Sequence, residues 1–154
     1  METVLLAAAP IESLDAYLAT DVGGLGLQRA QQLGPEATIE VIRASGLRGR
    51  GGGGFPTGRK WATIANAEGT HRYVVGNGAE GEPGTFKDRA LIRANPYQLV
   101  EGIMIAAFAV RAAEAFVGLK ANFAVEVARL TQAIEEMQAA GICENCPITI
   151  VEGP

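Results

Sequence analysis

The chain has 154 residues, of which 48% are hydrophobic and 19% charged, and its formal net charge is -4. This composition is typical of one globular domain with a real core rather than of a disordered chain. The negative charge argues against a general binder of nucleic acid or anionic membranes, because such surfaces need a basic excess. Two cysteines are too few for a disulfide framework, which agrees with a cytoplasmic protein.

No segment has the features of a targeting signal or a membrane span. The start METVLLAAAP contains Glu2 and no basic residue, so it lacks the positive beginning of a secretory signal. Three charged residues interrupt the apolar stretch 99–119, whereas a membrane helix needs about 18 uninterrupted apolar residues. A cytoplasmic protein that does not itself span a membrane is therefore expected.

The first half of the chain predicts helices around a glycine-rich loop. IESLDAYLAT indicates a short helix, and GPEATIEVIRASG indicates a helix over about 35–45, with Pro35 in its first turn and Gly46 just past its end. After the glycine-rich loop, Thr57 can cap another helix, RKWATIANA. The apolar run Tyr73–Gly76 then predicts a buried strand.

The second half alternates helices and strands. Asn95 begins the helix PYQLVEGIMIAAFAV, which is apolar nearly all round and is expected to be buried on several sides. Residues 115–120 and the segment PITIVEG predict the second and third strands. Between them lies a predicted long helix with an apolar stripe at spacings of three and four: Phe123, Val127, Leu130, Ile134 and Met137.

Three apolar strands separated by crossover helices predict a parallel sheet with right-handed connections, and hence an α/β sandwich. Ligands of such sheets bind at the carboxyl ends of the strands. The loop NGAEGEPGTFKD follows the first strand there, and a turn at Lys120 follows the second. These segments are therefore the candidate ligand-binding loops.

Seven glycines fall within the thirteen residues 46–58, and four cations accompany them: Arg48, Arg50, Arg59 and Lys60. Ordering a glycine costs roughly 0.5–1 kcal/mol more than ordering an alanine, so a loop of this kind is either mobile or held by a ligand. Free backbone N–H groups, a following helix amino terminus and four cations predict a phosphate cradle. The alternative is a flexible linker, which the embedded Phe55, Pro56 and Trp61 disfavour.

Two familiar phosphate-binding motifs fit this loop poorly. Gly49, Gly51 and Gly54 satisfy G-x-G-x-x-G, but the segment leaves a predicted helix, whereas a dinucleotide-binding fingerprint leaves a strand. Arg59 stands where a P-loop needs its lysine. The prediction of a phosphate cradle therefore depends on the backbone donors and the charges alone.

The loop Asn77–Arg89 carries the opposite charge. It presents an amide and two carboxylates, Glu80 and Glu82, on a glycine-rich turn, and these groups bind hydroxyls or ring N–H groups. A phosphate-binding loop beside a loop that carries carboxylates suggests a nucleotide ligand. Taken alone, the loop is equally compatible with a solvated acidic turn.

GLRGRGGGGFPTGRKW followed by YVVGNGAEGEPGTFKDRALIRANPYQLVEG resembles the flavin-binding half of the NADH-oxidising flavoprotein subunit of respiratory complex I, the 51 kDa subunit. Related subunits occur in NAD-linked hydrogenases and formate dehydrogenases, and the likeness runs from about Ile11 to the end. It implies a Rossmann-like, three-layer α/β domain with a parallel sheet, preceded by an N-terminal helix and the glycine-rich loop. It also implies that NADH gives a hydride to FMN and that the electrons leave singly through iron–sulfur clusters.

The resemblance assigns roles to eight residues of the two loops. The FMN would be held by Gly49, Arg50, Gly51, Lys60 and Asn77. Glu80 would lie near the flavin, Phe55 would stack on the adenine of NADH, and Glu82 would contact the nicotinamide end as the catalytic residue. FMN and NADH are thus the implied cofactor and substrate, with no metal or iron–sulfur cluster in this chain.

The sequence departs from the family at several points. Ala79 stands where the family has an aspartate that hydrogen-bonds the flavin nucleotide, Gly53 replaces a customary alanine, and Arg59 replaces a customary leucine. The family continues into a segment that closes the flavin pocket and into ubiquitin-like and iron–sulfur domains. We therefore expect residues 1–154 to form a single, incomplete FMN- and NADH-binding domain that alone binds FMN weakly or not at all and oxidises no NADH.

Cys143 and Cys146 form a C-x-x-C pair. A zinc site or a four-iron cluster needs four ligands, and the only histidine, His71, is distant in sequence. We expect ordinary thiols in a helix-to-strand turn, with a redox pair or an intersubunit metal half-site as the alternatives.

Two classes of function remain open. The first is a part of an NADH dehydrogenase, with a thioredoxin-like two-iron subunit and other iron–sulfur subunits as the implied partners. The second is a non-catalytic flavin- or nucleotide-binding module that docks in a larger redox complex. Either would be cytoplasmic, and its complex could hold it peripherally at the inner face of the cell membrane.

Overall fold

The computed structural model of the chain describes residue 6 and residues 9–69 and 71–154. The helices of this part are α1 (Leu14–Leu18), α2 (Leu25–Leu33), α3 (Pro35–Ala44), α4 (Thr57–Ala65), α5 (Lys87–Ala94), α6 (Pro96–Val110) and α7 (Ala124–Ala139). The strands are β1 (Tyr73–Asn77), β2 (Glu114–Lys120) and β3 (Ile148–Gly153).

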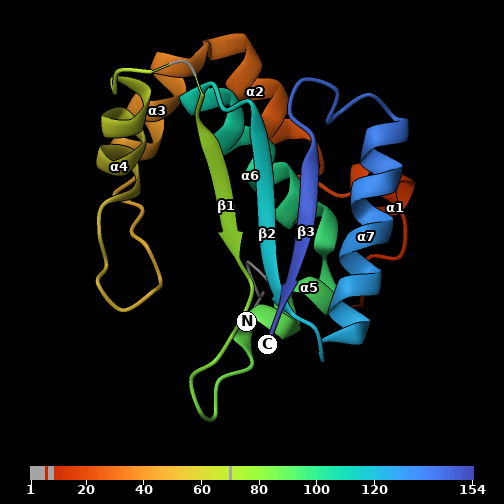
Figure 1. Cartoon of the computed structure of the whole chain (residues 1–154). Coiled ribbons are helices and arrows are strands. Elements are labelled where there is room, and N and C mark those ends of the chain that lie inside the picture. The colour runs from red at the N-terminus through yellow and green to blue at the C-terminus, as the bar shows by residue number, and fades with distance from the viewer. Residues whose placement is uncertain (1–5, 7–8, 70) are drawn as a thin grey trace.

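The three strands form one parallel sheet in the order β1-β2-β3 (Figure 1). Val75 pairs with Phe116, and Gly118 pairs with both Asn77 and Val151. The predicted strands and their parallel arrangement are confirmed. All three strands have their carboxyl ends at the same edge, so the loops that follow them gather there.

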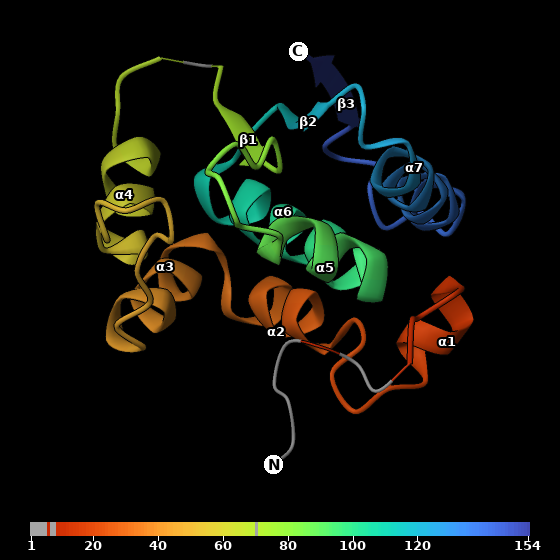
Figure 2. The same ribbon diagram turned by 90° about the horizontal axis from the view of Figure 1, so that it is seen from below.

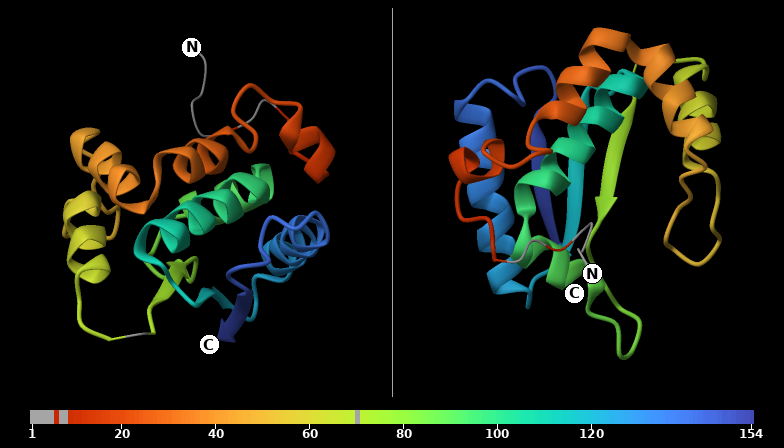
Figure 3. Two further views of the ribbon diagram at one scale, coloured as in Figure 1. Left: turned by 90° about the horizontal axis from the view of Figure 1, so that it is seen from above. Right: turned by 180° about the vertical axis from the view of Figure 1, so that it is seen from behind.

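The described helices that contact the sheet pack on one of its faces. Helix α6 contacts β1 and β2, and α7 contacts β3. Helices α2 and α3 pack in turn on α6, farther from the sheet (Figure 2). The α/β domain therefore has three layers in the order sheet, inner helices, outer helices, and Figure 3 shows the same arrangement from above and behind.

Helix α6 is the centre of the core. Val100, Tyr97 and Ala109 are fully buried, as the apolar sequence of this helix predicts. The side chain of Asn95 accepts a hydrogen bond from the backbone N–H of Gln98 at 3.1 Å, which fixes the start of the helix. None of the helices in the described part of the chain is long and apolar enough to cross a membrane.

Two helices were not predicted, and in both cases a carboxylate from outside the helix accepts N–H groups at its start. The buried Glu101 accepts hydrogen bonds from the backbone N–H groups of Gly24 and Leu27 at 3.0 and 2.8 Å, and these bonds fix the start of α2. The residue before the helix, Gly24, has no side chain to cap it, so the local sequence did not indicate a helix start. Helix α5 begins within the segment that the sequence predicted to be an acidic loop. There the carboxylate of Glu80 accepts a hydrogen bond from the backbone N–H of Asp88. Local patterns could not reveal either contact.

Two local predictions were wrong. Thr57 is the first residue of α4, and Pro56 occupies the cap position without a side-chain cap bond. Strand β1 was expected to be buried, but Tyr73 and Val75 are exposed because no described element covers that face of the sheet.

Candidate functional site

The acidic loop leaves the carboxyl end of β1 through a tight turn. Asn77 ends the strand, and its side-chain oxygen accepts a hydrogen bond from the N–H of Ala79 at 3.1 Å. Gly78 donates from its backbone to the carbonyl of Gly118 at 2.9 Å. A Cβ atom at Gly78 would lie 2.7 Å from the end of the Leu119 side chain, so any larger residue in this turn would require Leu119 to shift.

The glycine-rich loop is fixed at both ends. The backbone N–H of Thr57 donates to the carbonyl of Leu47 at 2.9 Å, and the N–H of Gly49 donates to the carbonyl of Phe55 at the same distance. At the start of α4, a Cβ atom on Gly58 would lie 2.5 Å from the Cα of Arg43, because α3 and α4 pack closely there. The loop thus resembles a hairpin whose tip is residues 50–54.

The tip of this loop keeps free donors. Among the described residues, the backbone N–H groups of Arg50, Gly51 and Gly52 donate to no other backbone group. Cβ atoms built on Gly51 and Gly52 would meet nothing within 4 Å, so the tip is open rather than packed. Unengaged N–H groups next to Arg50 suit an anionic ligand such as a phosphate.

The two loops line a common cavity of about 340 Å³. The glycine-rich loop contributes Arg50 and Gly51, and the acidic loop contributes Asn77, Glu80 and Glu82. Five of the eight site residues indicated by the sequence are therefore brought together. Lys87 and Asp88 from the start of α5 complete one wall; the sequence placed them in the candidate loop that follows the first strand but assigned them no role.

The other three predicted residues line a neighbouring cavity of about 410 Å³. Gly49, Phe55 and Lys60 form one side of it, and Tyr73 and Val75 of β1 form part of the other. The Phe55 ring is half exposed, with the Arg59 guanidinium 5.7 Å from its centroid. The glycine-rich loop therefore contributes to both cavities.

Glu80 and Glu82 occupy different environments. Glu82 is exposed, whereas the side chain of Glu80 is only 3% exposed and its Oε1 accepts a hydrogen bond from the N–H of Asp88 at 3.4 Å. The ammonium of Lys87 lies 3.6 Å from that oxygen. Burial opposes ionisation of Glu80, but the Asp88 N–H and the Lys87 charge outweigh it and lower its pKa.

Next to this wall, the ion pair between Glu80 and Arg89 lacks a hydrogen bond. Glu80 Oε2 and Arg89 Nε are buried, lie 3.9 Å apart, and have no hydrogen-bond partner within the described part of the chain. The Arg89 guanidinium also stacks 5.1 Å from the centre of the Phe123 ring, and Lys120 lies on the same ring at 6.0 Å. Glu80 Oε2 is thus paired with Arg89 by charge but not by a hydrogen bond. The Glu80 carboxylate and the Lys87 ammonium at this wall fit the donor and acceptor groups of a nucleotide.

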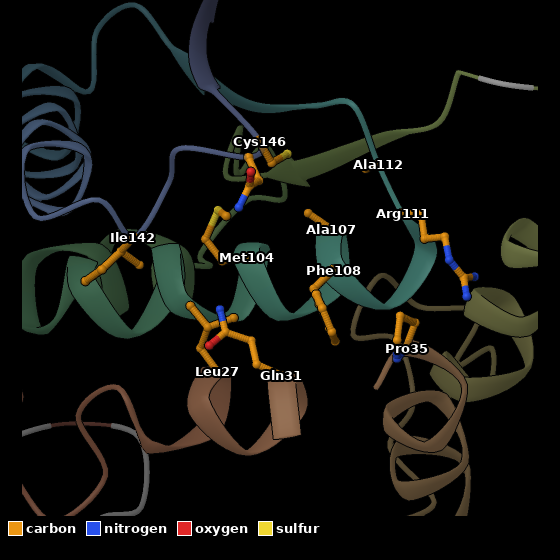
Figure 4. A pocket seen from close by; sticks show the side chains of 11 residues that line it. Leu27, Gln31, Pro35, Met104, Ala107, Phe108, Arg111, Ala112, Ile142 and Cys146 are labelled. Atoms are coloured by element: carbon orange, nitrogen blue, oxygen red, sulfur yellow. The ribbon is translucent and has the colours of Figure 1, made fainter. Parts of the chain in front are cut away.

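A third cavity, of about 290 Å³, lies between α2 and α6 beside the segment that precedes β3 (Figure 4). Leu27, Met104 and Phe108 line it, and none of the eight predicted residues does. Cys146 also reaches it, and both cysteines are buried free thiols. Burial and the neighbouring Cys146 raise the pKa of Cys143 to about 11, which disfavours a reactive thiolate.

Comparisons with known proteins show the family and the fold of the chain. Residues 42–154 match the sequence profile of a family described as the Nuo51 FMN-binding domain. The chain is 45% identical over 129 residues to an NADH-quinone oxidoreductase subunit of Streptomyces coelicolor and 42% identical over 131 residues to one of Aquifex aeolicus. These matches cover 84% and 85% of this chain but only 28% and 30% of the relatives, so the chain spans less than a third of their length.

A solved structure supports the fold of the chain. The crystal structure of NAD+-reducing NiFe-hydrogenase in the H2-reduced state superposes with a TM-score of 0.75 at 31% sequence identity. The match covers 99% of this chain and 25% of the hydrogenase chain. The similarity therefore extends over nearly all of the fold described above.

Proposed function

Because the chain belongs to the Nuo51 FMN-binding domain family, we propose that its two loops bind FMN and NADH as part of an NADH-oxidising flavoprotein in a larger redox complex. The observation that carries the proposal is the common cavity: the free N–H groups of the glycine-rich loop and the carboxylates of the acidic loop line the same space. A nucleotide needs both kinds of partner at once, at its phosphate and at its ring.

The position of each site residue indicates which part of the FMN it would contact. The N–H groups at Arg50 and Gly51, with Lys60 at the first turn of α4, bind the FMN phosphate. Asn77, at the end of β1, orients the flavin, and Glu80 stabilises the loop beside it. When bound, FMN supplies hydride acceptance from NADH and the release of single electrons.

NADH would use the residues that remain exposed. The face of the Phe55 ring is open to solvent on the glycine-rich loop and can stack on an adenine. The exposed Glu82 is free to accept a hydrogen bond from the nicotinamide amide. The two cavities, about 340 and 410 Å³, each lie within the usual size range of ligand sites.

A non-catalytic flavin-binding module is the second candidate, and Ala79 favours it. This residue lines the common cavity at the position where the resemblance predicts an aspartate that contacts the flavin nucleotide. A site that lacks this contact would hold FMN less tightly and could serve docking alone. NADH oxidation by the assembled complex, with FMN bound to this chain, separates the two candidates.

The experiment is a titration of the purified chain with FMN, followed by flavin fluorescence. We expect saturable quenching, weakened at least ten-fold in Lys60→Ala because a hydrogen bond to a charged group contributes about 1.5–3 kcal/mol. Arg29→Ala removes an exposed cation on α2, away from both cavities, and should leave the affinity unchanged. NADH and an artificial acceptor are then added to the assembled complex. An absence of saturable FMN binding by both the chain and the complex would overturn the proposal.

A further inference from the structure

The Phe55 ring carries a cation on one of its faces. The guanidinium carbon of Arg59 lies 5.7 Å from the ring centroid, within the distance of about 6 Å at which a cation is attracted to an aromatic face. Phe55 is 51% exposed, so this contact leaves room for a further planar group on the ring. Arg59 is itself exposed, and no carboxylate forms an ion pair with it in the part of the chain that the structure describes.

Two neighbouring cations of α4 occupy different places. Lys60 lines the cavity of about 410 Å³, whereas Arg59, the residue before it, lies over the Phe55 ring. Consecutive residues of an α-helix point about 100° apart, so the two side chains leave the helix in different directions. Lys60 and the loop N–H groups serve the FMN phosphate in the proposed function, which leaves the charge of Arg59 available for another anion.

The sequence around Phe55 contains no carboxylate. Residues 41–67 include no aspartate or glutamate, but they include five cations: Arg43, Arg48, Arg50, Arg59 and Lys60. This composition bears on the choice between dinucleotides. A carboxylate at the adenosine ribose accepts a hydrogen bond from the 2′-hydroxyl of NAD, whereas an arginine there accommodates the 2′-phosphate of NADP. The segment that carries Phe55 offers an arginine for this choice and no carboxylate.

The position of Arg59 suits a phosphate on that ribose. The ribose is bonded directly to the base, so an adenine stacked on Phe55 would bring its 2′ position next to the ring where the Arg59 guanidinium lies. A guanidinium can bind a phosphate through two parallel N–H bonds, and such charge-assisted bonds are roughly twice as strong as neutral ones. Arg59 also lies in the first turn of α4, which packs on α3, so its backbone is held in place.

We propose that Arg59 binds the 2′-phosphate of NADPH, so that the adenine side of this site favours the phosphorylated dinucleotide over NADH. The inference rests on the proposed stacking of Phe55 on adenine, and it adds the residue that distinguishes the two riboses. The 2′-phosphate lies on the adenosine half of the dinucleotide, away from the nicotinamide. Arg59 therefore determines specificity and takes no part in hydride transfer.

The test uses fragments that contain only the adenosine end of the dinucleotide. The purified chain is titrated with adenosine 2′,5′-bisphosphate, the end of NADPH, and with 5′-AMP, the end of NADH, and binding is followed by the NMR shift of the Phe55 amide. Adenosine 3′,5′-bisphosphate has the charge of the first fragment and controls for general attraction to the basic loop. We expect the 2′,5′ isomer to bind more tightly than either other fragment by about ten-fold or more, the scale of one charge-assisted contact.

Variants of Arg59 assign this difference to its charge. Arg59→Leu should weaken the 2′,5′ isomer to the affinity of 5′-AMP, and unchanged binding of 5′-AMP would show that the variant still folds. Arg59→Lys should keep part of the preference, because it retains the charge without the two parallel N–H donors. Arg29→Leu, which removes an exposed cation of α2, is the matched control and should keep the full preference.

Other outcomes would overturn the inference. Equal affinities for the 2′,5′ isomer and 5′-AMP, or a preference that survives Arg59→Leu, would do so while leaving the stacking on Phe55 intact. Tighter binding of the 3′,5′ isomer would assign the charge to a 3′-phosphate instead. If no fragment binds, the adenine contact of Phe55 fails together with this inference, and the FMN titration reports separately on the flavin site.

Discussion

The carboxylate of Glu80 accepts a hydrogen bond from the backbone N–H of Asp88 at 3.4 Å, and this contact joins the acidic loop to the first turn of α5. We predict that Glu80→Ala releases the loop and increases amide hydrogen exchange at Asp88. Glu82→Ala, which removes an exposed carboxylate from the same loop, is the matched control for exchange and should leave the Asp88 amide protected. Equal exchange in both variants would show that the contact does not hold the loop.

The same contact predicts a pH dependence. The pKa of Glu80 in the folded protein lies below its ordinary value of 4.5. A carboxylate with a depressed pKa stabilises the fold above pH 4.5, and this contribution is lost as the pH falls through the folded-state pKa. A carboxyl carbon titration by NMR should therefore give a midpoint below 4.5 for Glu80, and Asp88 amide exchange should rise over the same range. A midpoint above 4.5 would contradict the prediction.

The open tip of the glycine-rich loop predicts a loss of FMN without a loss of fold. In Gly51→Val the new side chain meets no protein atom near its Cβ, so unfolding free energy should change by less than about 0.5 kcal/mol. The same side chain would occupy the cavity and block the phosphate, so flavin stoichiometry should fall. Gly53→Ala, where the Cβ is equally unobstructed, is the control and should retain FMN. Unchanged flavin in Gly51→Val would place the phosphate elsewhere.

Ala79 allows a gain-of-affinity test. Ala79→Asp places a carboxylate in the common cavity and should tighten FMN binding by about 1–2 kcal/mol, the scale of a hydrogen bond with one charged partner. This corresponds to a decrease of about 5- to 30-fold in Kd, measured by flavin fluorescence. Ala128→Asp adds the same charge at an exposed position of α7 and should have no effect. A weaker affinity for Ala79→Asp would mean that the flavin lies differently from the proposal.

The buried thiols should be slow to react. With a pKa of about 11, only about one Cys143 side chain in a thousand is a thiolate at pH 8, and burial restricts access further. Alkylation at pH 8 in native buffer should therefore be at least 100-fold slower than in denaturant. Rapid native alkylation of either cysteine would favour the redox-pair alternative instead.

Local sequence patterns were sufficient for the elements whose signals are local. Helix α6 has its cap at Asn95 and a continuous apolar surface, and the strands β2 and β3 are short apolar runs. The rule that ligand loops follow parallel strands also identified the loop of Asn77, Glu80 and Glu82 as a candidate ligand-binding segment, and this loop lines the common cavity. These predictions need only periodicity and topology.

The missed features all depend on distant contacts. Helix α2 begins where Glu101, 74 residues from Leu27 in sequence, accepts its N–H groups. The inward position of Glu80 depends on the hydrogen bond that it accepts from the Asp88 N–H at the start of α5. The exposure of one face of β1 depends on where α6 and α7 pack on the sheet. No window of neighbouring residues contains this information, because tertiary packing decides it.

The close contact between Gly58 and Arg43 limits what ligand binding costs in entropy. Together with the hydrogen bond from Thr57 to Leu47, it immobilises the base of the glycine-rich loop before any ligand arrives. Restricting one backbone residue costs about 1–2 kcal/mol, so ordering all thirteen residues at once would cost more than the whole affinity of an ordinary micromolar nucleotide. Only the tip, residues 50–54, has to be ordered. The glycine content can therefore serve close approach to a phosphate without making the loop too mobile to bind it.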